Sequence, residues 1–303
     1  MDRWRGLLRV PVCCNGNAYC RVAASLCLSP ISKKLIVPSA NAIFFNGDRV
    51  DGSGNPVIER LSDLQKMAEV LVSKFHSHIN VWIVEAPVFN GPFAIYKEFI
   101  PSVNCWGEPA SYDPTGLPAS TATVSLLLNG LQEVKNAIPD EHQQEEESVS
   151  PLLCEPKTIL LGFSKGGTVV NQLVTELSCS EVQSTETQCL REAFLNSISE
   201  IHYVDAGLNR AGAYLTDGDA IQRISDRVVH GAGPLRFFLH GTPRQWGDGR
   251  RVWIRNEKDE LVRLLLCEAQ RSGGKLQVLE KCYFADKPPD LQMHFEIIEV
   301  LNV

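Results

Sequence analysis

The chain of 303 residues lacks any apolar run close to the roughly 18–20 residues that a membrane-spanning helix needs. It also lacks a basic excess, because 29 Lys and Arg residues stand against 36 Asp and Glu residues and give a net charge of −7. General nucleic-acid binding needs a basic face that replaces counterions. We therefore expect no transmembrane segment and no nucleic-acid partner.

Cys-x-x-Cys pairs are absent, although the chain has ten cysteines. No secretory apolar segment precedes the cysteines, since Arg9 interrupts the early apolar run. This pattern indicates reduced, mostly buried thiols in an intracellular protein. The His-x-His pair of His76 and His78 has no third ligand nearby in the sequence, so we expect neither a metal nor an organic cofactor.

Acidic residues are missing from residues 3–47, which carry several arginines. That bias is typical of an organellar transit peptide, so the compartment is cytoplasmic or mitochondrial. The alternative is a folded β-hairpin in which 7–14 and 18–26 flank Asn15-Gly16, a dipeptide suited to the positive φ angles of a two-residue turn. We favour the hairpin.

Short apolar strands alternate with amphipathic helices along the rest of the chain. The expected strands are 42–45, 81–84, 158–161, 201–204, 235–239 and 276–284; the expected helices are 58–75, 119–138, 166–177, 185–197, 257–270 and a last one that begins near His294. The alternation predicts an α/β fold, a mostly parallel sheet with helices on both faces, in one domain over residues 1–303. In such sheets the reactive site lies beyond the carboxyl ends of the strands.

Two segments show neither the helical nor the strand periodicity of apolar residues. Residues 88–117 are rich in aromatics and turn formers, which indicates a possible lid. Its aromatic side chains could line an acyl pocket or only pack the lid: Phe89, Phe93, Tyr96 and Phe99. Residues 139–150 are polar and acidic, and we expect a solvated, mobile loop there.

The strongest motif is Gly162-Phe163-Ser164-Lys165-Gly166, which follows an expected strand and opens an expected helix. Gly-x-Ser-x-Gly in that context is typical of a nucleophile elbow, where a serine on a strained turn projects into a cleft and the glycines avoid collision with neighbouring strands. The alternative is a glycine-rich turn without chemistry. A phosphate-binding loop is disfavoured because its Gly-x-x-x-x-Gly-Lys-Ser/Thr pattern is absent.

A serine nucleophile needs a base, and in α/β-hydrolases the acid and then the histidine follow the serine in the chain. We assign His294 as the base because it stands between the last strand and the last helix. His240, at a strand end, is a second-rank candidate for the cleft, whereas His202 lies inside a strand and His230 lies in a loop.

Two aspartates compete to orient the histidine. Asp248 follows the strand 235–239, at the commonest position for the acid, and Asp205 ends the preceding strand. We favour Asp248 and keep Asp205 as its rival. Either residue could instead form a turn or cap a helix.

The oxyanion hole of such a site needs two backbone donors. We expect one from the amide of Lys165 and the other from Gly47 or Asp48, in the loop after an early strand. Lysine is an unusual residue directly after the nucleophile. Its ammonium group either stabilises an anionic substrate or is simply solvated.

These motifs together resemble the α/β-hydrolase-like family typified by the human chromosome-two open-reading-frame-sixty-nine protein. The segments that carry the resemblance are Phe45-Asn46-Gly47-Asp48, Gly162-Phe163-Ser164-Lys165-Gly166, Asp205-Ala206-Gly207, Thr242-Pro243 with Asp248, and Gln292-Met293-His294-Phe295. The resemblance implies an α/β-hydrolase-like fold and a triad of Ser164, Asp248 and His294. It also implies a link to mitochondria.

The leading hypothesis is a serine hydrolase that acts on a small-molecule ester, thioester or related acyl bond without a cofactor. The alternative is a catalytically silent protein of hydrolase fold that binds a partner or lipid. A Ser-x-Gly turn and a distant histidine are compatible with both, so the choice depends on geometry and on chemical reactivity.

Overall fold

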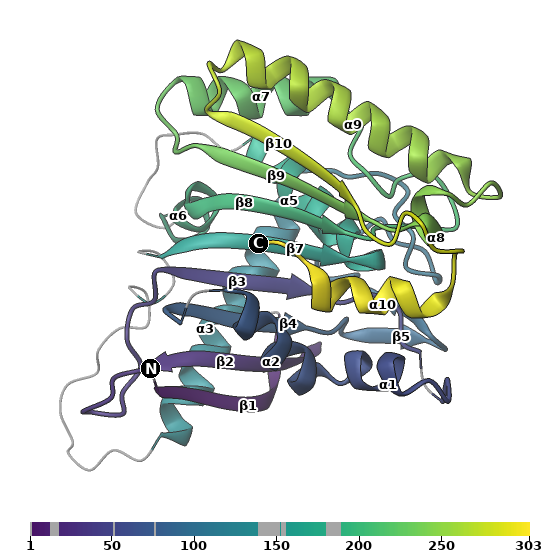
Figure 1. The fold of residues 1–303 in the computed structure, drawn as a ribbon. Helices are drawn as coiled ribbons and strands as arrows, with labels where there is room; N and C mark the ends of the chain where they lie inside the picture. Colours follow the sequence, from purple (N-terminus) through teal and green to yellow (C-terminus); the bar gives the residue numbers. More distant parts are fainter. Residues whose placement is uncertain are drawn as a thin grey trace.

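The computed structural model describes residues 2–12, 18–50, 52–75, 77–138, 152, 156–179 and 189–303. One eight-stranded sheet runs through them in the order β1-β2-β4-β3-β7-β8-β9-β10 (Figure 1). β2 is antiparallel to β1 and β4, and the other neighbouring strands are parallel. The strands are β1 (Asp2–Pro11), β2 (Tyr19–Leu28), β3 (Ala40–Phe45), β4 (Ile79–Val84), β7 (Lys157–Phe163), β8 (Ile198–Val204), β9 (Leu235–Gly241) and β10 (Leu276–Cys282), with β5 (Val88–Asn90) and β6 (Phe93–Ile95) as a separate hairpin.

Helices cover both faces of the sheet (Figure 1). They are α1 (Pro56–Ser62), α2 (Leu64–Lys74), α3 (Pro118–Ala137), α5 (Gly167–Cys179), α6 (Cys189–Ser197), α7 (Gly218–Val229), α8 (Pro243–Trp246), α9 (Val252–Arg271) and α10 (Leu291–Val300). Strand β3 shows why both faces are apolar. Ile43 and Phe45 pack in the core with α3, α5, α6, α7 and α9, whereas Ala42 and Phe44 pack in the core with α1, α2 and α10. The predicted α/β architecture is confirmed.

The predicted helix 58–75 is in fact two helices, and Asp63 is the cause. Its backbone N–H bonds to Arg60 O and its side chain accepts from Lys66 N, so the residue ends α1 and caps α2. The last helix begins three residues before His294, at Leu291, because Asp290 accepts from Met293 N. His294 therefore lies inside the first turns of α10.

The N-terminal segment forms the expected hairpin at the edge of the sheet. Strands β1 and β2 pair from Asp2 with Leu28 to Pro11 with Tyr19, so both are longer than predicted. The predicted turn at Asn15-Gly16 and the acidic loop 139–150 lie outside the described residues.

The thiols differ from expectation in the described part of the chain. Cys20 and Cys27 are buried there, and four others are exposed: Cys105, Cys179, Cys267 and Cys282. The prediction that most cysteines are buried is thus wrong for this set, in which two of six are buried. Within the same ranges, no helix combines the length and the apolarity that crossing a bilayer requires.

Candidate active site

Ser164 occupies the sharp turn between β7 and α5. Its φ of +52° lies in the left-handed region, which is costly for any residue other than glycine. A Cβ at Gly162 would lie 2.6 Å from Gly167 Cα, and a Cβ at Gly166 would lie 2.0 Å from Phe45 O. The two glycines of the motif are thus required because the turn packs directly against its own helix and against β3.

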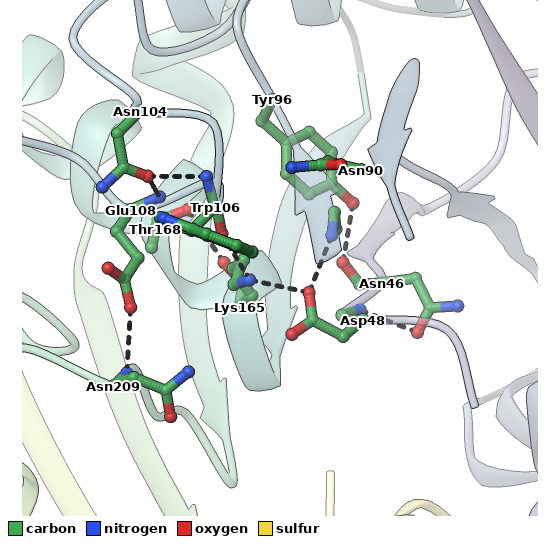
Figure 2. Close-up of polar contacts among 12 residues, drawn as sticks. Asn46, Asp48, Asn90, Tyr96, Asn104, Trp106, Glu108, Lys165, Thr168 and Asn209 are labelled. Carbon is green, nitrogen blue, oxygen red and sulfur yellow. Dashed lines mark hydrogen bonds and ion pairs between the residues drawn. The ribbon is translucent and has the colours of Figure 1, made fainter. Parts of the chain in front are cut away.

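The loop after β3 passes directly over Ser164. A Cβ on Gly47 would lie 2.6 Å from Ser164 Cβ and 3.2 Å from Ser164 Oγ. The Gly47 N–H donates to Asn46 Oδ1 at 2.9 Å, and Asn46 O accepts from the buried Tyr96 hydroxyl at 2.7 Å (Figure 2). These bonds hold the loop backbone in contact with the serine.

His294 lies on α10 and is paired with Asp205 at the end of β8. The distance from His294 Nδ1 to Asp205 Oδ2 is 2.6 Å, and both residues are buried. Thr242, directly after β9, donates to this carboxylate, with its N–H 2.7 Å from Oδ1 and its hydroxyl oxygen 2.9 Å from Oδ2. The imidazole ring stacks on Phe163, the residue before Ser164, at 4.6 Å between ring centroids.

The structure places Asp205, and not Asp248, against His294. Asp248 accepts from Arg250 N at 2.9 Å and from Arg251 Nε at 2.9 Å, and these contacts lower its pKa. The physical reason is the short helix α8, which starts directly after β9 and carries Asp248 past the strand end. Thr242 belongs to the segments that carry the family resemblance, but no role in the site was assigned to it, because nothing in the order of residues places it against Asp205.

Lys165 is neither solvated nor open to substrate, which corrects both sequence-based expectations. Its side chain is 4% exposed, and its Nζ lies 2.8 Å from Asp48 Oδ1 and donates to Trp106 O at 2.8 Å (Figure 2). The ammonium group also lies 4.7 Å from the centre of the Phe93 ring. The charge is therefore neutralised inside the protein, under the segment 93–106.

The segment 88–117 packs onto the body of the protein. Tyr96 and Phe99 are fully buried in the core, so these two aromatics pack the segment rather than line a pocket. Glu108 accepts from Asn209 N at 3.2 Å and Tyr112 donates to Gly212 O at 2.6 Å. That the segment acts as a lid stays a prediction.

His240 does not line a cleft, because its ring is buried in a chain of hydrogen bonds on one face of the sheet. These contacts determine which atom donates in each hydrogen bond. The Tyr283 hydroxyl oxygen accepts from Asn302 N–H and lies 3.0 Å from His240 Nδ1. His240 Nε2 lies 3.1 Å from His202 Nδ1, and His202 Nε2 lies 3.2 Å from Glu200. Every contact in this chain pairs one donor with one acceptor when each imidazole is neutral and carries its proton on Nε2.

Burial lowers the pKa of His240 to about 2 and lowers the pKa of His202, against the opposing effect of Glu200. Because the unfolded chain protonates first, the stability that the neutral pair contributes is present above about pH 6.5 and is lost as the pH falls. We expect a loss of roughly 1.4 kcal/mol per pH unit from His240 below that value, and a further loss in the same direction from His202.

Urea unfolding at pH 7.5 and pH 5.5 measures this loss, and the His240→Phe variant should show a weaker pH dependence than the native chain. The control His230→Asn, at an exposed position, should keep the native dependence. Burial raises the carboxyl pKa of Glu176 and Glu257, and this shift makes the fold more stable as the pH falls. The contribution of His240 is therefore taken from the difference between the variant and the native chain. An identical slope in the His240→Phe variant would contradict the neutral pair.

A cavity of about 330 Å³ opens beside the loop after β3. Asn46 and Asp48, on either side of Gly47, line it together with Phe295, the neighbour of His294 in the chain, whereas Ser164 and His294 themselves do not. Its wall includes the buried carboxylate of Glu85, which accepts from Arg49 Nε at 2.9 Å. The cavity is therefore polar.

Among the described residues, no group of three or more histidine, cysteine, aspartate and glutamate side chains could hold a metal ion. His76, one half of the His-x-His pair, lies outside those residues.

The sheet order, the strand-to-helix turn at Ser164 and the His294–Asp205 pair at the carboxyl ends of the strands define an α/β-hydrolase fold. The family model C2orf69 matches residues 119–268, so this part of the chain is similar to that family. It is 28% identical to the mitochondrial protein C2orf69 of Homo sapiens and 24% identical to its homologue in Danio rerio. These alignments cover 78% of this chain, and 66% and 64% of the relatives. The chain thus spans about two thirds of their length.

Solved structures with a similar arrangement include the siderophore hydrolase EstA from Aspergillus nidulans, with a TM-score of 0.47 and 13% identity over 98% of this chain and 92% of that one. An IroE-like serine hydrolase from Shewanella oneidensis has a TM-score of 0.46 and 9% identity over 98% of this chain and 78% of that one. The fold assignment rests on the strand order and the turn at Ser164, and not on these scores.

Proposed function

We propose that this chain is a serine hydrolase that cleaves an ester, thioester or related acyl bond. The observation that carries the proposal is the placement of Ser164. Its left-handed turn stands at the carboxyl end of β7, and the ring of His294, bound by Asp205, packs against the preceding residue. Strained backbone combined with an oriented imidazole is the arrangement that nucleophilic catalysis uses.

Asp205 sets the proton on the imidazole. Because its carboxylate accepts the Nδ1 proton of His294, Nε2 is the basic nitrogen. Ser164 Oγ attacks the acyl carbon and passes its proton to Nε2, which then gives that proton to the departing alcohol or thiol. A water molecule releases the acid from the acyl-enzyme by the same two transfers, with the proton returned to Ser164.

The negative charge on the acyl oxygen needs two backbone donors. We propose the amides of Lys165 and Asp48 for this role. Asp48 is preferred to Gly47 because the Gly47 N–H already donates to Asn46. Both donors lie near the N-terminal end of α5, whose partial positive charge favours an anion.

The cavity beside Asn46, Asp48 and Phe295 is the space that we propose for one part of a small-molecule acyl substrate. Its charged wall favours a polar group there over a plain hydrocarbon chain. The relatives are named mitochondrial proteins, which supports the proposal that this chain acts in the mitochondrion.

A fluorophosphonate probe tests the proposal, because it phosphonylates only an activated serine. We expect the native chain to be labelled and Ser164→Ala to remain unlabelled. The matched control is Ser73→Ala, at an exposed serine of α2, and it should label like the native chain. Labelling that persists in Ser164→Ala would disprove the assignment. A folded native chain that resists labelling would favour the alternative, a silent protein that binds a partner or lipid.

A further inference from the structure

The two residues that donate the proposed oxyanion hydrogen bonds are also joined through their side chains. Lys165 Nζ and Asp48 Oδ1 lie 2.8 Å apart, and the lysine side chain is almost fully buried (Figure 2). One residue follows the nucleophile on η1 (Ser164–Gly166) and the other follows β3. The ion pair therefore spans the gap between the two halves of the proposed oxyanion hole.

Further contacts fix both ends of this ion pair. Asp48 Oδ1 also accepts from Ala94 N at 2.7 Å, and Lys165 Nζ also donates to Trp106 O at 2.8 Å. Gly107, with a φ of +71°, closes the segment over the lysine, and a Cβ there would lie 3.2 Å from Lys165 Cδ. The segment 93–107 thus holds the two side chains in one geometry.

Stability alone is a poor reason for this arrangement. Removing an ammonium group from water is costly, and an apolar side chain of similar size usually serves a buried position as well or better. An ion pair with a buried ammonium group, here bound to the partly exposed Asp48, instead imposes a defined distance and direction between the elements that it joins. That property is required where two backbone amides must converge on one oxygen atom, because a displacement of about 1 Å can cost roughly 100-fold in rate.

We propose that the Lys165–Asp48 ion pair, completed by the segment 93–107, is a positioning device that sets the separation of the two oxyanion donors. Lys165 and Asp48 are positioning residues through their side chains, and the ammonium group does not bind substrate. The inference rests on the proposed serine-hydrolase function, because an oxyanion hole has no role without it.

The test measures how fast the fluorophosphonate probe labels full-length Lys165→Met, Asp48→Asn and the double variant. The maximal labelling rate should fall about 10- to 100-fold in each single variant, because the phosphoryl oxygen occupies the same donors, while the half-saturating probe concentration stays within about twofold. The double variant should label no more slowly than the slower single variant, since the residues act as one unit. The control Lys66→Met breaks an exposed ion pair with Glu69 and should label at the native rate.

Circular dichroism and thermal unfolding establish that the variants are folded. Asp48→Asn keeps its size and its acceptor for Ala94 N–H, so it carries the test if Lys165→Met does not fold. Native labelling rates in the folded single variants would overturn the inference, as would a change confined to the half-saturating concentration. A native chain that is not labelled at Ser164 would instead refute the proposed function itself.

Discussion

Asp205→Asn is expected to slow the labelling of Ser164 by the fluorophosphonate probe about 10³- to 10⁴-fold. The asparagine amide would present an N–H to His294 Nδ1, so the imidazole would carry its proton on Nε2 and could not accept the proton of Ser164. In the native chain Thr242 donates to both oxygens of the Asp205 carboxylate. The asparagine has only one side-chain oxygen, so only one of these two hydrogen bonds would be kept. The labelling rate of the variant measures the effect, and an unchanged far-UV circular dichroism spectrum shows that the variant is folded.

Asp248→Asn is the matched control, because the sequence favours Asp248 whereas the structure pairs it with Arg251. Its labelling rate should stay within about threefold of native, as expected for a partly exposed carboxylate away from the imidazole. A larger loss in Asp248→Asn than in Asp205→Asn would show that Asp248 orients the base.

Gly166→Ala is expected to destabilise the fold by about 3 kcal/mol and to lower the melting temperature by about 10 °C. The new Cβ would lie 2.0 Å from Phe45 O and 2.6 Å from Phe45 C, which are backbone atoms that no rotamer change can move. Phe45 cannot shift easily, because β3 pairs with β4 on one side and β7 on the other. Thermal unfolding followed by circular dichroism measures the change.

Gly249→Ala is the control for that measurement. Its new Cβ would meet nothing within 4 Å, and its backbone does not lie in the left-handed region. We expect a change in unfolding free energy within about 0.5 kcal/mol. If Gly166→Ala melts at the same temperature as Gly249→Ala, the contact between the elbow and β3 is looser than the structure indicates.

The sequence was informative wherever the signal was local. The turn around Ser164 could be anticipated because its glycines stand two residues to either side of the serine, next to an apolar strand and an amphipathic helix. The edge hairpin and the bounds of α3 and α5 followed from apolar spacing and turn residues in the same way, whereas α7 was not predicted and α9 begins five residues earlier than expected. The helix at 58–75 failed, because its apolar spacing continues across the break and only the cap at Asp63 reveals two helices.

The acid could not be decided from the sequence. Asp205 and Asp248 both follow strands, and both strands end at the same edge of the sheet. What separates the two residues is α8, whose four residues carry Asp248 away while Thr242 holds the Asp205 carboxylate in place. Neither contact has a signature in the order of residues.

By itself, the order of residues determined the alternation of strands and helices, the strained turn at Ser164 and the position of His294 near the end of the chain, because each depends on neighbours within a few residues. Tertiary structure alone decided that Asp205 meets His294 and that Lys165 is buried against Asp48 beneath Trp106. These contacts join residues that are 59 to 117 positions apart, and such residues meet only when the sheet has brought its strand ends together.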